Sequence, residues 1–296
     1  MVGPLISDTA LWAGCAQSVA ALLRDIAARE VLPRWQSMRI DHKADGSLLS
    51  EADTAVQQAL AQTLPTIYPA PLLGEESAPT EQLALWHAAN TSDTSVWIAD
   101  PIDGTTNFVS GLPWYAISVA LMHQGQVVLG VTYTPALNTL WLASLGGGAF
   151  MNDQRLVLPQ THQPLRSALI GVDMTYLPAQ LRMAIANCSP SGLSRDTDQL
   201  APWRGWRSLG ASTLEWCALA SGQIQAYVHG GQMPWDAAAG RLILSEAGGY
   251  SAALSAIMSL PITYAGPPDF LPPTAYAAAA PGVWQDWQYW LREHRG

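Results

Sequence analysis

Acidic residues gather at four places along this sequence. They are found around Asp53, at Gly74-Glu75-Glu76, at Asp100-Pro101-Ile102-Asp103 and at Trp235-Asp236. Only 12% of all residues are charged, so acids that gather in such a chain need an explanation. Two carboxylates about 4 Å apart repel each other by on the order of 4 kcal/mol at an effective dielectric of about 20. Several of them can share one pocket in ionised form only if cations compensate, and oxygen ligands of this kind suit Mg²⁺.

The most specific of these segments follows Val96–Ala99, an apolar run with the composition of a buried strand. Asp100 and Asp103 come at its end, where Gly104 permits an unusual backbone angle. The amides of Gly104-Thr105-Thr106 follow, as at the start of a helix, where N–H groups and the helix dipole bind anions. Carboxylates that hold cations beside amides that hold an anion are what metal-assisted phosphoryl transfer requires. An isolated D-P-x-D-G is more often a turn cap, but the full D-P-I-D-G-T-T-N-F favours the metal site.

Further motifs extend this pattern over roughly residues 40–250. The segments are Lys43–Ser47, Ser50–Asp53, Gly74–Ser77, Trp97–Phe108, Gly148–Asn152, Gly210–Ser212, Trp235–Gly240 and Glu246–Gly249. In order and spacing they resemble the inositol monophosphatase family of Mg²⁺-dependent, lithium-sensitive sugar phosphatases. The resemblance implies a phosphomonoesterase with two or three Mg²⁺ ions per site, in which a metal-activated water attacks the phosphate in line.

The resemblance also implies a role for each matching position. For the first Mg²⁺ it implies Glu75, Asp100 and the carbonyl of Ile102 as ligands, and for a second Asp100, Asp103 and Asp236. The attacking water is oriented by Glu75 and Thr105, and Asp53 lies near the network that positions Thr105. The phosphate and substrate contacts implied are Gly104, Thr105, Lys43, Gly210, Ala211 and His229. Lys43 is the only lysine of the chain, although a single lysine at this place is also compatible with chance.

The match departs from the inositol-type pattern at His229. Inositol-type members carry an acid at this position, seven residues before Asp236, where it contacts substrate hydroxyls. A neutral imidazole cannot accept two hydroxyl hydrogen bonds as a carboxylate does, and His229 is equally compatible with an ordinary strand-end residue. The resemblance therefore implies phosphate-ester hydrolysis more directly than it implies inositol as the substrate.

Several substrates fit this pattern. We expect a small phosphorylated polyol, sugar or amino alcohol of the inositol-phosphate type, with histidinol phosphate, fructose bisphosphate or 3′-phosphoadenosine nucleotides as alternatives. The run Thr106-Asn107-Phe108 favours the inositol and histidinol branch. A regulatory or binding protein that keeps the fold without turnover is a further alternative. The complete set of implied ligands argues against it.

The elements that must position these residues change in character along the chain. Helices are expected over residues 7–31 and 51–64, the second capped by Ser50 and ending before Pro65. Short strands are expected at 96–99, 116–122, 127–133, 139–143 and 149–151. From about residue 165, strands at 168–173, 203–208 and 224–229 alternate with helices at 178–188, 211–221 and 236–247.

This pattern predicts an α+β N-terminal half with an antiparallel sheet, followed by an α/β C-terminal half. The resemblance implies that the two halves form a layered α-β-α-β-α sandwich. We place the division at residues 1–160, with most metal ligands, and 161–296, with Asp236 and the substrate contacts. Trp284, Trp287 and Trp290 follow at three-residue spacing, which favours a packed helix face over a ligand site, with part of a subunit contact as a further alternative.

Composition excludes several classes of protein. The chain has 296 residues, a net charge of −9 and 49% hydrophobic residues, and no charged residue lies between Gly104 and Asn152. Polar residues, glycine and proline interrupt this run, so it does not predict a membrane span. The first residues do not resemble a signal peptide, and we expect a cytoplasmic protein.

Nucleic-acid binding is not expected either, because no basic stripe is present. Arg204 and Arg207 near Trp203 are too few, and a strand that packs its tryptophans is the better interpretation. Three scattered cysteines predict reduced thiols without disulfides, and the histidines lack zinc spacing. The expected partners are a small phosphorylated metabolite and a second copy of the chain in a homodimer.

Overall fold

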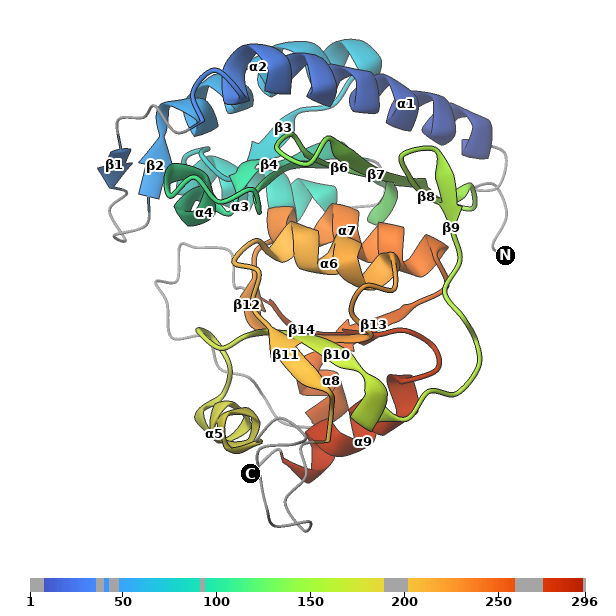
Figure 1. The fold of residues 1–296 in the computed structure, drawn as a ribbon. Helices are drawn as coiled ribbons and strands as arrows, with labels where there is room; N and C mark the ends of the chain where they lie inside the picture. Colours follow the sequence, from blue (N-terminus) through green and yellow to red (C-terminus); the bar gives the residue numbers. More distant parts are fainter. Residues whose placement is uncertain are drawn as a thin grey trace.

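The chain folds into five alternating layers of helices and sheets (Figure 1). This computed structural model describes residues 8–35, 40–42, 48–90, 94–188, 202–258 and 274–294, without the side chains of 40–42 and 48–49. Lys43 lies outside the described residues. From one side of the molecule to the other, the layers are a helix pair, a seven-stranded sheet, a second helix pair, a five-stranded sheet and an outer helix layer. The predicted α-β-α-β-α sandwich is confirmed.

The larger sheet has the strand order β3-β4-β5-β6-β7-β8-β9. Its strands are β3 (Leu72–Gly74), β4 (Ser95–Asp103), β5 (Ala116–His123), β6 (Gln126–Thr134), β7 (Thr139–Ser144), β8 (Gly148–Met151) and β9 (Gln154–Leu156). Neighbouring strands are antiparallel except for the parallel pair β3 and β4. The long uncharged run of the sequence supplies β5 to β8, and almost all residues of β5 are buried. A sheet covered on both faces needs no charged residue, which explains the run.

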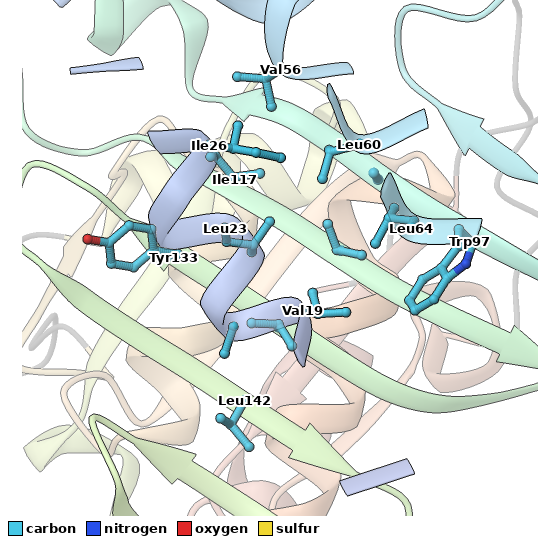
Figure 2. Packing of buried hydrophobic residues seen from close by; sticks show 14 of the residues in the cluster. Val19, Leu23, Ile26, Val56, Leu60, Leu64, Trp97, Ile117, Tyr133 and Leu142 are labelled. Carbon is cyan, nitrogen blue, oxygen red and sulfur yellow. The ribbon is translucent and has the colours of Figure 1, made fainter. Parts of the chain in front are cut away.

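Two N-terminal helices cover the outer face of this sheet (Figure 2). They are α1 (Thr9–Ile26), extended by a π-helical turn at Ala27–Val31, and α2 (Glu51–Ile67). Leu23 of α1 and Leu60 of α2 pack with Trp97 and Ile117 of the sheet, all of them at most 1% exposed. Burial of each such aliphatic side chain contributes about 1.5–3 kcal/mol. Two short strands, β1 (Ile40–His42) and β2 (Leu48–Ser50), precede α2, and α3 (Pro79–Ala89) and α4 (Thr105–Val109) flank β4 in sequence.

The central layer consists of α6 (Ser212–Ala220) and α7 (Pro234–Glu246). Residues 213–220 of α6 are all buried, as expected for a helix with a sheet on either side. Glycines allow the close packing. A Cβ added at Gly240 would lie 2.3 Å from Cβ of Trp216, and one at Gly130 would lie 2.8 Å from the backbone of Ala239. These close contacts fix where the middle of α7 lies against α6 and against the larger sheet.

The smaller sheet has the order β11-β10-β12-β14-β13. Its strands are β10 (Leu169–Asp173), β11 (Gly205–Arg207), β12 (Ala226–Gln232), β13 (Tyr250–Ala253) and β14 (Thr274–Ala279). Strands β11, β10 and β12 are parallel, and β14 is antiparallel to both of its neighbours. The outer layer contains α5 (Ala179–Asn187), α8 (Leu254–Met258) and α9 (Trp284–Glu293). Every strand of the larger sheet precedes residue 157 and every strand of the smaller one follows residue 168.

The indole side chains near the C-terminus pack inward. Trp287 is fully buried and Trp290 is 7% exposed, and both rings contact Trp203. The interpretation of the tryptophan stripe as a packed helix face is confirmed. Cys15, Cys188 and Cys217 are free thiols. No helix within the described residues is both long and apolar enough to cross a bilayer.

The limits of two helices differ from the prediction for reasons that their prolines explain. The second helix does not end before Pro65 but continues to Ile67, because a proline in the last turn interrupts little of the helix. The N–H of Tyr68 still bonds the carbonyl of Leu64, and the hydroxyl of Thr66 bonds that of Thr63. The helix expected from residue 236 begins at Pro234, a favoured first residue because its missing N–H has no helical partner there.

Candidate metal and phosphate site

The site begins at an irregularity in β4. This strand pairs regularly with β5 as far as Asp100, opposite Ser118, and the pairing resumes with Asp103 opposite Ala116. One residue more lies on β4 than on β5 between these pairs, which is the pattern of a β-bulge. The bulge redirects the end of the strand, so that both Asp100 and Asp103 reach the same side.

Asp100 is the most unusual side chain of the site. It is 2% exposed, and its Oδ1 has no hydrogen-bond partner among the described residues. Burial raises the pKa of Asp100 well above its ordinary value, and the nearby charges of Glu75, Asp103, Asp236 and Asp53 raise it further. A buried carboxylate oxygen without a partner costs free energy unless something outside the protein contacts it.

Asp103 is held by the start of α6. Its Oδ2 accepts hydrogen bonds from the N–H of Thr213 at 2.8 Å and from the hydroxyl of Thr213 at 2.5 Å. Its Oδ1 accepts from the N–H and hydroxyl of Ser212 at 3.2 and 3.4 Å. Burial raises the pKa of Asp103 to about 6, although the bonds from Thr213 and Ser212 favour the ionised form and oppose that rise. Sequence reasoning missed Ser212 and Thr213 as partners, because a helix start is the only local signal that they give.

Asp236 approaches from the central helix layer. As the third residue of α7, it accepts a hydrogen bond through Oδ2 from the N–H of Met233 at 2.8 Å, so it caps this helix. It also joins the two acids of β4. Asp100, Asp103 and Asp236 each offer one carboxylate oxygen, and these oxygens all lie within 4.8 Å of one another. We call these three residues the carboxylate cluster.

Glu75 lies beside the cluster, directly after β3. Its N–H donates to the carbonyl of Ala99 at 3.2 Å, and its carbonyl accepts from the buried side chain of Gln82 at 2.8 Å. Among charged residues, Glu75 has the largest effect on the pKa of Asp100, which it raises. The carbonyl oxygen of Ile102 accepts from the hydroxyl of Thr105 at 3.0 Å, and a carbonyl has a second lone pair for another contact.

Thr105 connects the cluster to the N-terminal helices. Its Oγ1 lies 3.0 Å from the carbonyl of Ile102 and 3.5 Å from Oδ1 of Asp53. Asp53 is fully buried, and its other oxygen accepts from the N–H of Ser50 at 2.9 Å and from the hydroxyl of Ser50. Asp53 therefore forms the capping box of α2 and fixes that helix against Thr105.

Gly104 forms the tight turn after the cluster. Its φ of 83° is left-handed, and an added Cβ would lie 2.9 Å from the carbonyl oxygen of Trp114 and 3.0 Å from Cβ of Ala211. The backbone oxygen of Gly210 would be 3.2 Å away. Only glycine satisfies both the conformation and the space. Gly210 and Ala211 thus lie against the amides predicted to bind phosphate.

Two side chains hold the loop that contains Gly210 and Ala211. Sequence reasoning did not identify either of them. Asn107 donates through Nδ2 to the carbonyls of Trp114 at 2.7 Å and of Leu209 at 2.8 Å. Glu215 accepts from the N–H of Leu209 at 2.8 Å. Burial raises the pKa of Glu215 to about 8, so it is mostly protonated at neutral pH. The loop is therefore bound from both sides, by a neutral amide and by a neutral acid.

His229 lies apart from this group, near the end of β12. It is 6% exposed and pairs in strand register with Asp173 of β10. Burial lowers the pKa of His229, and the charge of Asp173 opposes that change. The structure thus brings together all the described site residues predicted from the sequence except His229, which lies with Asp173 at a neighbouring strand edge.

The chain was compared with known proteins. It matches the family described as "Inositol monophosphatase family" over residues 14–290. An inositol-1-monophosphatase of Mesorhizobium japonicum is 34% identical over 224 residues, which are 73% of this chain and 75% of the relative. A putative Nus factor SuhB of Neisseria meningitidis serogroup B is 34% identical over 219 residues, 72% of this chain and 76% of the relative. The crystal structure of inositol monophosphatase-II from Staphylococcus aureus superposes with a TM-score of 0.67 at 25% identity, over 97% of this chain and 96% of that one.

Proposed function

Because this chain belongs to the inositol monophosphatase family, we propose that the carboxylate cluster holds Mg²⁺ and that the site hydrolyses the phosphate ester of a small metabolite. The protein is a phosphoric monoester hydrolase of that family. The observation that carries the metal proposal is the unpartnered Oδ1 of Asp100, buried among like charges. A divalent cation supplies the contact that this oxygen lacks and offsets the repulsion that raises the pKa of Asp100.

The donor set fits magnesium. Three carboxylates meet within 4.8 Å, and Glu75 and the carbonyl of Ile102 lie next to them, so every available donor is an oxygen. Hard oxygen ligands of this kind suit Mg²⁺, which keeps part of its water shell. We assign Glu75, Asp100 and Ile102 to one ion, and Asp100, Asp103 and Asp236 to a second. When bound, magnesium supplies positive charge that stabilises the phosphate oxygens and favours ionisation of a nearby water.

The residues around the cluster position the phosphate and the water. The amides after Gly104 form the phosphate contact, and Gly210 and Ala211 close it from the other side. Glu75 and the hydroxyl of Thr105 orient the attacking water, and Asp53 fixes Thr105 from α2. The water oxygen attacks phosphorus, the ester P–O bond breaks, and the alcohol leaves with a proton while inorganic phosphate remains. Catalysis then consists of positioning and charge stabilisation.

The proposed substrate is a small phosphorylated polyol, sugar or amino alcohol. The name of the relative from Mesorhizobium japonicum supports an inositol-phosphate-type ester. Histidinol phosphate, fructose bisphosphate and 3′-phosphoadenosine nucleotides are the alternatives within the superfamily.

The predicted homodimer is tested by light scattering on the purified chain, and a monomer at working concentration would contradict it.

Lithium sensitivity is a separate proposal. Li⁺ is a small, hard cation, and we expect it to compete for one of the Mg²⁺ positions at millimolar concentration. The measurement is phosphate release at fixed Mg²⁺ with increasing Li⁺, and with Na⁺ as the control salt. Equal responses to the two salts would contradict the proposal.

The function is tested by phosphate release from a panel of phosphate monoesters with and without Mg²⁺. Three proteins are compared: the unaltered chain, Asp236→Asn and Asp153→Asn. Asp153 is a matched control because it is exposed, lies in the β8–β9 turn and has a φ of 66° that asparagine also adopts. We expect Mg²⁺-dependent release that Asp236→Asn abolishes and Asp153→Asn preserves. No Mg²⁺-dependent release from any ester would overturn the proposed function, and full activity of Asp236→Asn would overturn the ligand assignment.

A further inference from the structure

The ends of β10 and β12 form a place in the fold where ligands bind in many α/β proteins. The two strands are parallel neighbours, and Asp173 and His229 are opposite each other at their carboxyl ends. From there the chain continues from β10 to α5 on the outer face of the sheet, and from β12 to α7 between the two sheets (Figure 1). In open α/β sheets, ligands bind outside the carboxyl ends of adjacent strands whose connections leave to opposite faces. Glu215 lies between this edge and the metal site, because its pKa is raised by burial and also by the charges of both Asp173 and Asp103.

Hydrogen bonding determines which groups His229 and Asp173 offer a ligand. The N–H of Gly231 donates to Nδ1 of His229 at 3.0 Å. In the neutral ring, the proton must therefore be on Nε2, which acts as a donor. Nε2 lies 3.8 Å from Oδ2 of Asp173, too far for a hydrogen bond. We call these two residues the strand-end pair. It offers one N–H donor and one carboxylate acceptor side by side.

The strand-end pair has a net negative charge. Burial keeps His229 neutral by lowering its pKa, and Glu215 behind it is mostly protonated because its pKa is raised to about 8. Arg207 at the end of neighbouring β11 does not compensate Asp173. Its side chain instead lines a cavity of about 500 Å³ together with Leu169 and Gln225. Leu169 is the first residue of β10 and Gln225 directly precedes β12, so this cavity lies at the opposite, amino ends of the two strands.

Asp173 is the more accessible member of the strand-end pair, and His229 is 6% exposed. The side chain of Asp173 is 23% exposed, and its Oδ1 accepts only from the N–H of Thr175, at 2.7 Å, among the residues that the structure describes. The ring of Tyr176 stacks on His229 with centroids 5.9 Å apart, and Tyr176 is 63% exposed. An aromatic face next to a carboxylate attracts a cation more strongly than it attracts a neutral hydroxyl.

We propose that the strand-end pair binds the alcohol portion of the substrate and selects phosphate esters that carry an ammonium group over uncharged polyol esters. This inference rests on the proposed phosphatase function and names its substrate class. The ammonium group donates to Oδ2 of Asp173, and Nε2–H of His229 donates to a neighbouring hydroxyl oxygen. An amino alcohol provides both groups, whereas a polyol provides only neutral partners for the carboxylate.

The test uses two esters that differ in one group. In serinol phosphate an amine replaces the 2-hydroxyl group of glycerol 3-phosphate. We would measure kcat/KM for both esters at pH 7 with Mg²⁺ and take the ratio of serinol phosphate to glycerol phosphate. The proteins are the unaltered chain, Asp173→Asn and the control Asp153→Asn. The ratio does not depend on how much of each protein is folded, so a poorly folding variant still gives a result.

We expect a ratio well above 1 for the unaltered chain, a fall of about tenfold or more in Asp173→Asn, and no change in Asp153→Asn. A ratio near or below 1 in the unaltered chain, the same ratio in Asp173→Asn, or an equal fall in Asp153→Asn would overturn the inference. Failure of the proposed function is distinguishable, because the unaltered chain would then release no phosphate from either ester with Mg²⁺.

Discussion

The two sheets of this protein contribute to the site with side chains in contrasting environments. The larger sheet supplies Asp100 and Asp103, which are 2% and 8% exposed and lie at the end of one irregular strand. The smaller sheet supplies Asp173 at the end of β10, and its side chain is 23% exposed. The segment after β10 supplies Tyr176, which is 63% exposed. The comparison teaches that Asp100 and Asp103, proposed to hold the metals, are buried, whereas Asp173, proposed to bind the charged group of the substrate, is partly accessible beside the buried His229. A change of substrate preference can therefore occur at the smaller sheet without disturbing the metal ligands.

A second contrast concerns the buried acids themselves. Glu215, beside the smaller sheet, has its oxygen bonded to Leu209, and burial raises its pKa to about 8. Asp100, on the larger sheet, also has a raised pKa, but its Oδ1 has no partner among the described atoms. The first acid is stable as a neutral group and needs no ion. The second needs a cation. Four changes test this difference, from the largest expected effect to the smallest.

Asp100→Asn should abolish activity and yet stabilise the metal-free protein. Loss of the shared ligand should lower kcat/KM by on the order of 10³-fold. Replacement of a buried acid, whose ionised form is disfavoured by burial and by Glu75 and Asp103, with a neutral amide should raise the melting temperature in the presence of a chelator. Activity and thermal denaturation measure the two effects on one sample. A variant that keeps activity, or that melts below the parent chain in chelator, would contradict the account.

Glu215→Gln should change how stability depends on pH. The folded-state pKa of about 8 is above the ordinary value of 4.5, so the folded state binds more protons than the unfolded state between these values. Stability contributed by this group is therefore complete at low pH and is lost as the pH rises toward 8. Compared with Glu215→Gln, the parent should lose on the order of 3 kcal/mol between pH 5 and 8.

Urea denaturation of both proteins at several pH values, with chelator present, measures the difference. Asp153→Asn is the control, because an exposed acid should leave the pH dependence unchanged. Parallel curves for the parent and Glu215→Gln would show that Glu215 is ionised in the folded protein.

Magnesium should stabilise the protein, and the effect should depend on pH. A ligand that binds only the folded state at about 100 times its dissociation constant contributes about 2.7 kcal/mol. Protons compete for the same oxygens, and the pKa of Asp103 is raised to about 6, so the shift in melting temperature should shrink from pH 7.5 to pH 5.5. Calcium-free buffers with added MgCl₂ suffice for this measurement. A shift that grows toward pH 5.5 would show that these carboxylates are not the ligands.

Gly104→Ala should have the smallest of the four effects, with Gly125→Ala as its matched control. Both glycines have a left-handed φ, 83° and 75°, but an added Cβ at Gly104 meets the backbone of Trp114 at 2.9 Å, and one at Gly125 meets nothing within 4 Å. Both variants carry the cost of an unfavourable φ, about 1 kcal/mol. Gly104→Ala should lose about 1 kcal/mol more, together with activity at the proposed phosphate contact. Equal losses of stability in the two variants would show that the turn at Gly104 accommodates a Cβ without a steric clash.

The sequence predicted the parts of the site that depend on neighbouring residues. Asp100 and Asp103 could be assigned because an apolar strand, two acids and Gly104 follow one another directly. Asp236 lies more than 130 residues away, and no local pattern connects it to Asp100. Only the family resemblance connects these two residues. The role of Asp103 as acceptor for Thr213 depends on how α6 packs against β4, which no sequence period records.

The fold shows the same limit. Strands at 116–122 and 127–133 were predicted because they are continuous apolar runs bounded by turns, and the structure has them at Ala116–His123 and Gln126–Thr134. The strand Thr274–Ala279 was not predicted, since its alanines have weak strand preference and are held by β12 and β13 on either side. Asp173 was not identified for a related reason: its position opposite His229 depends on the register of two strands more than 50 residues apart in sequence.

The central claim is that acids from β4 and from α7 hold the same metal ions. Calorimetric titration of Mg²⁺ into the metal-free chain tests it most directly, with Asp100→Asn, Asp236→Asn and the control Asp153→Asn measured under the same conditions. The account predicts that both Asp100→Asn and Asp236→Asn weaken Mg²⁺ binding at least tenfold, and that Asp153→Asn leaves it unchanged. Unchanged binding in Asp236→Asn would contradict it, because α7 would then contribute nothing to the metal site.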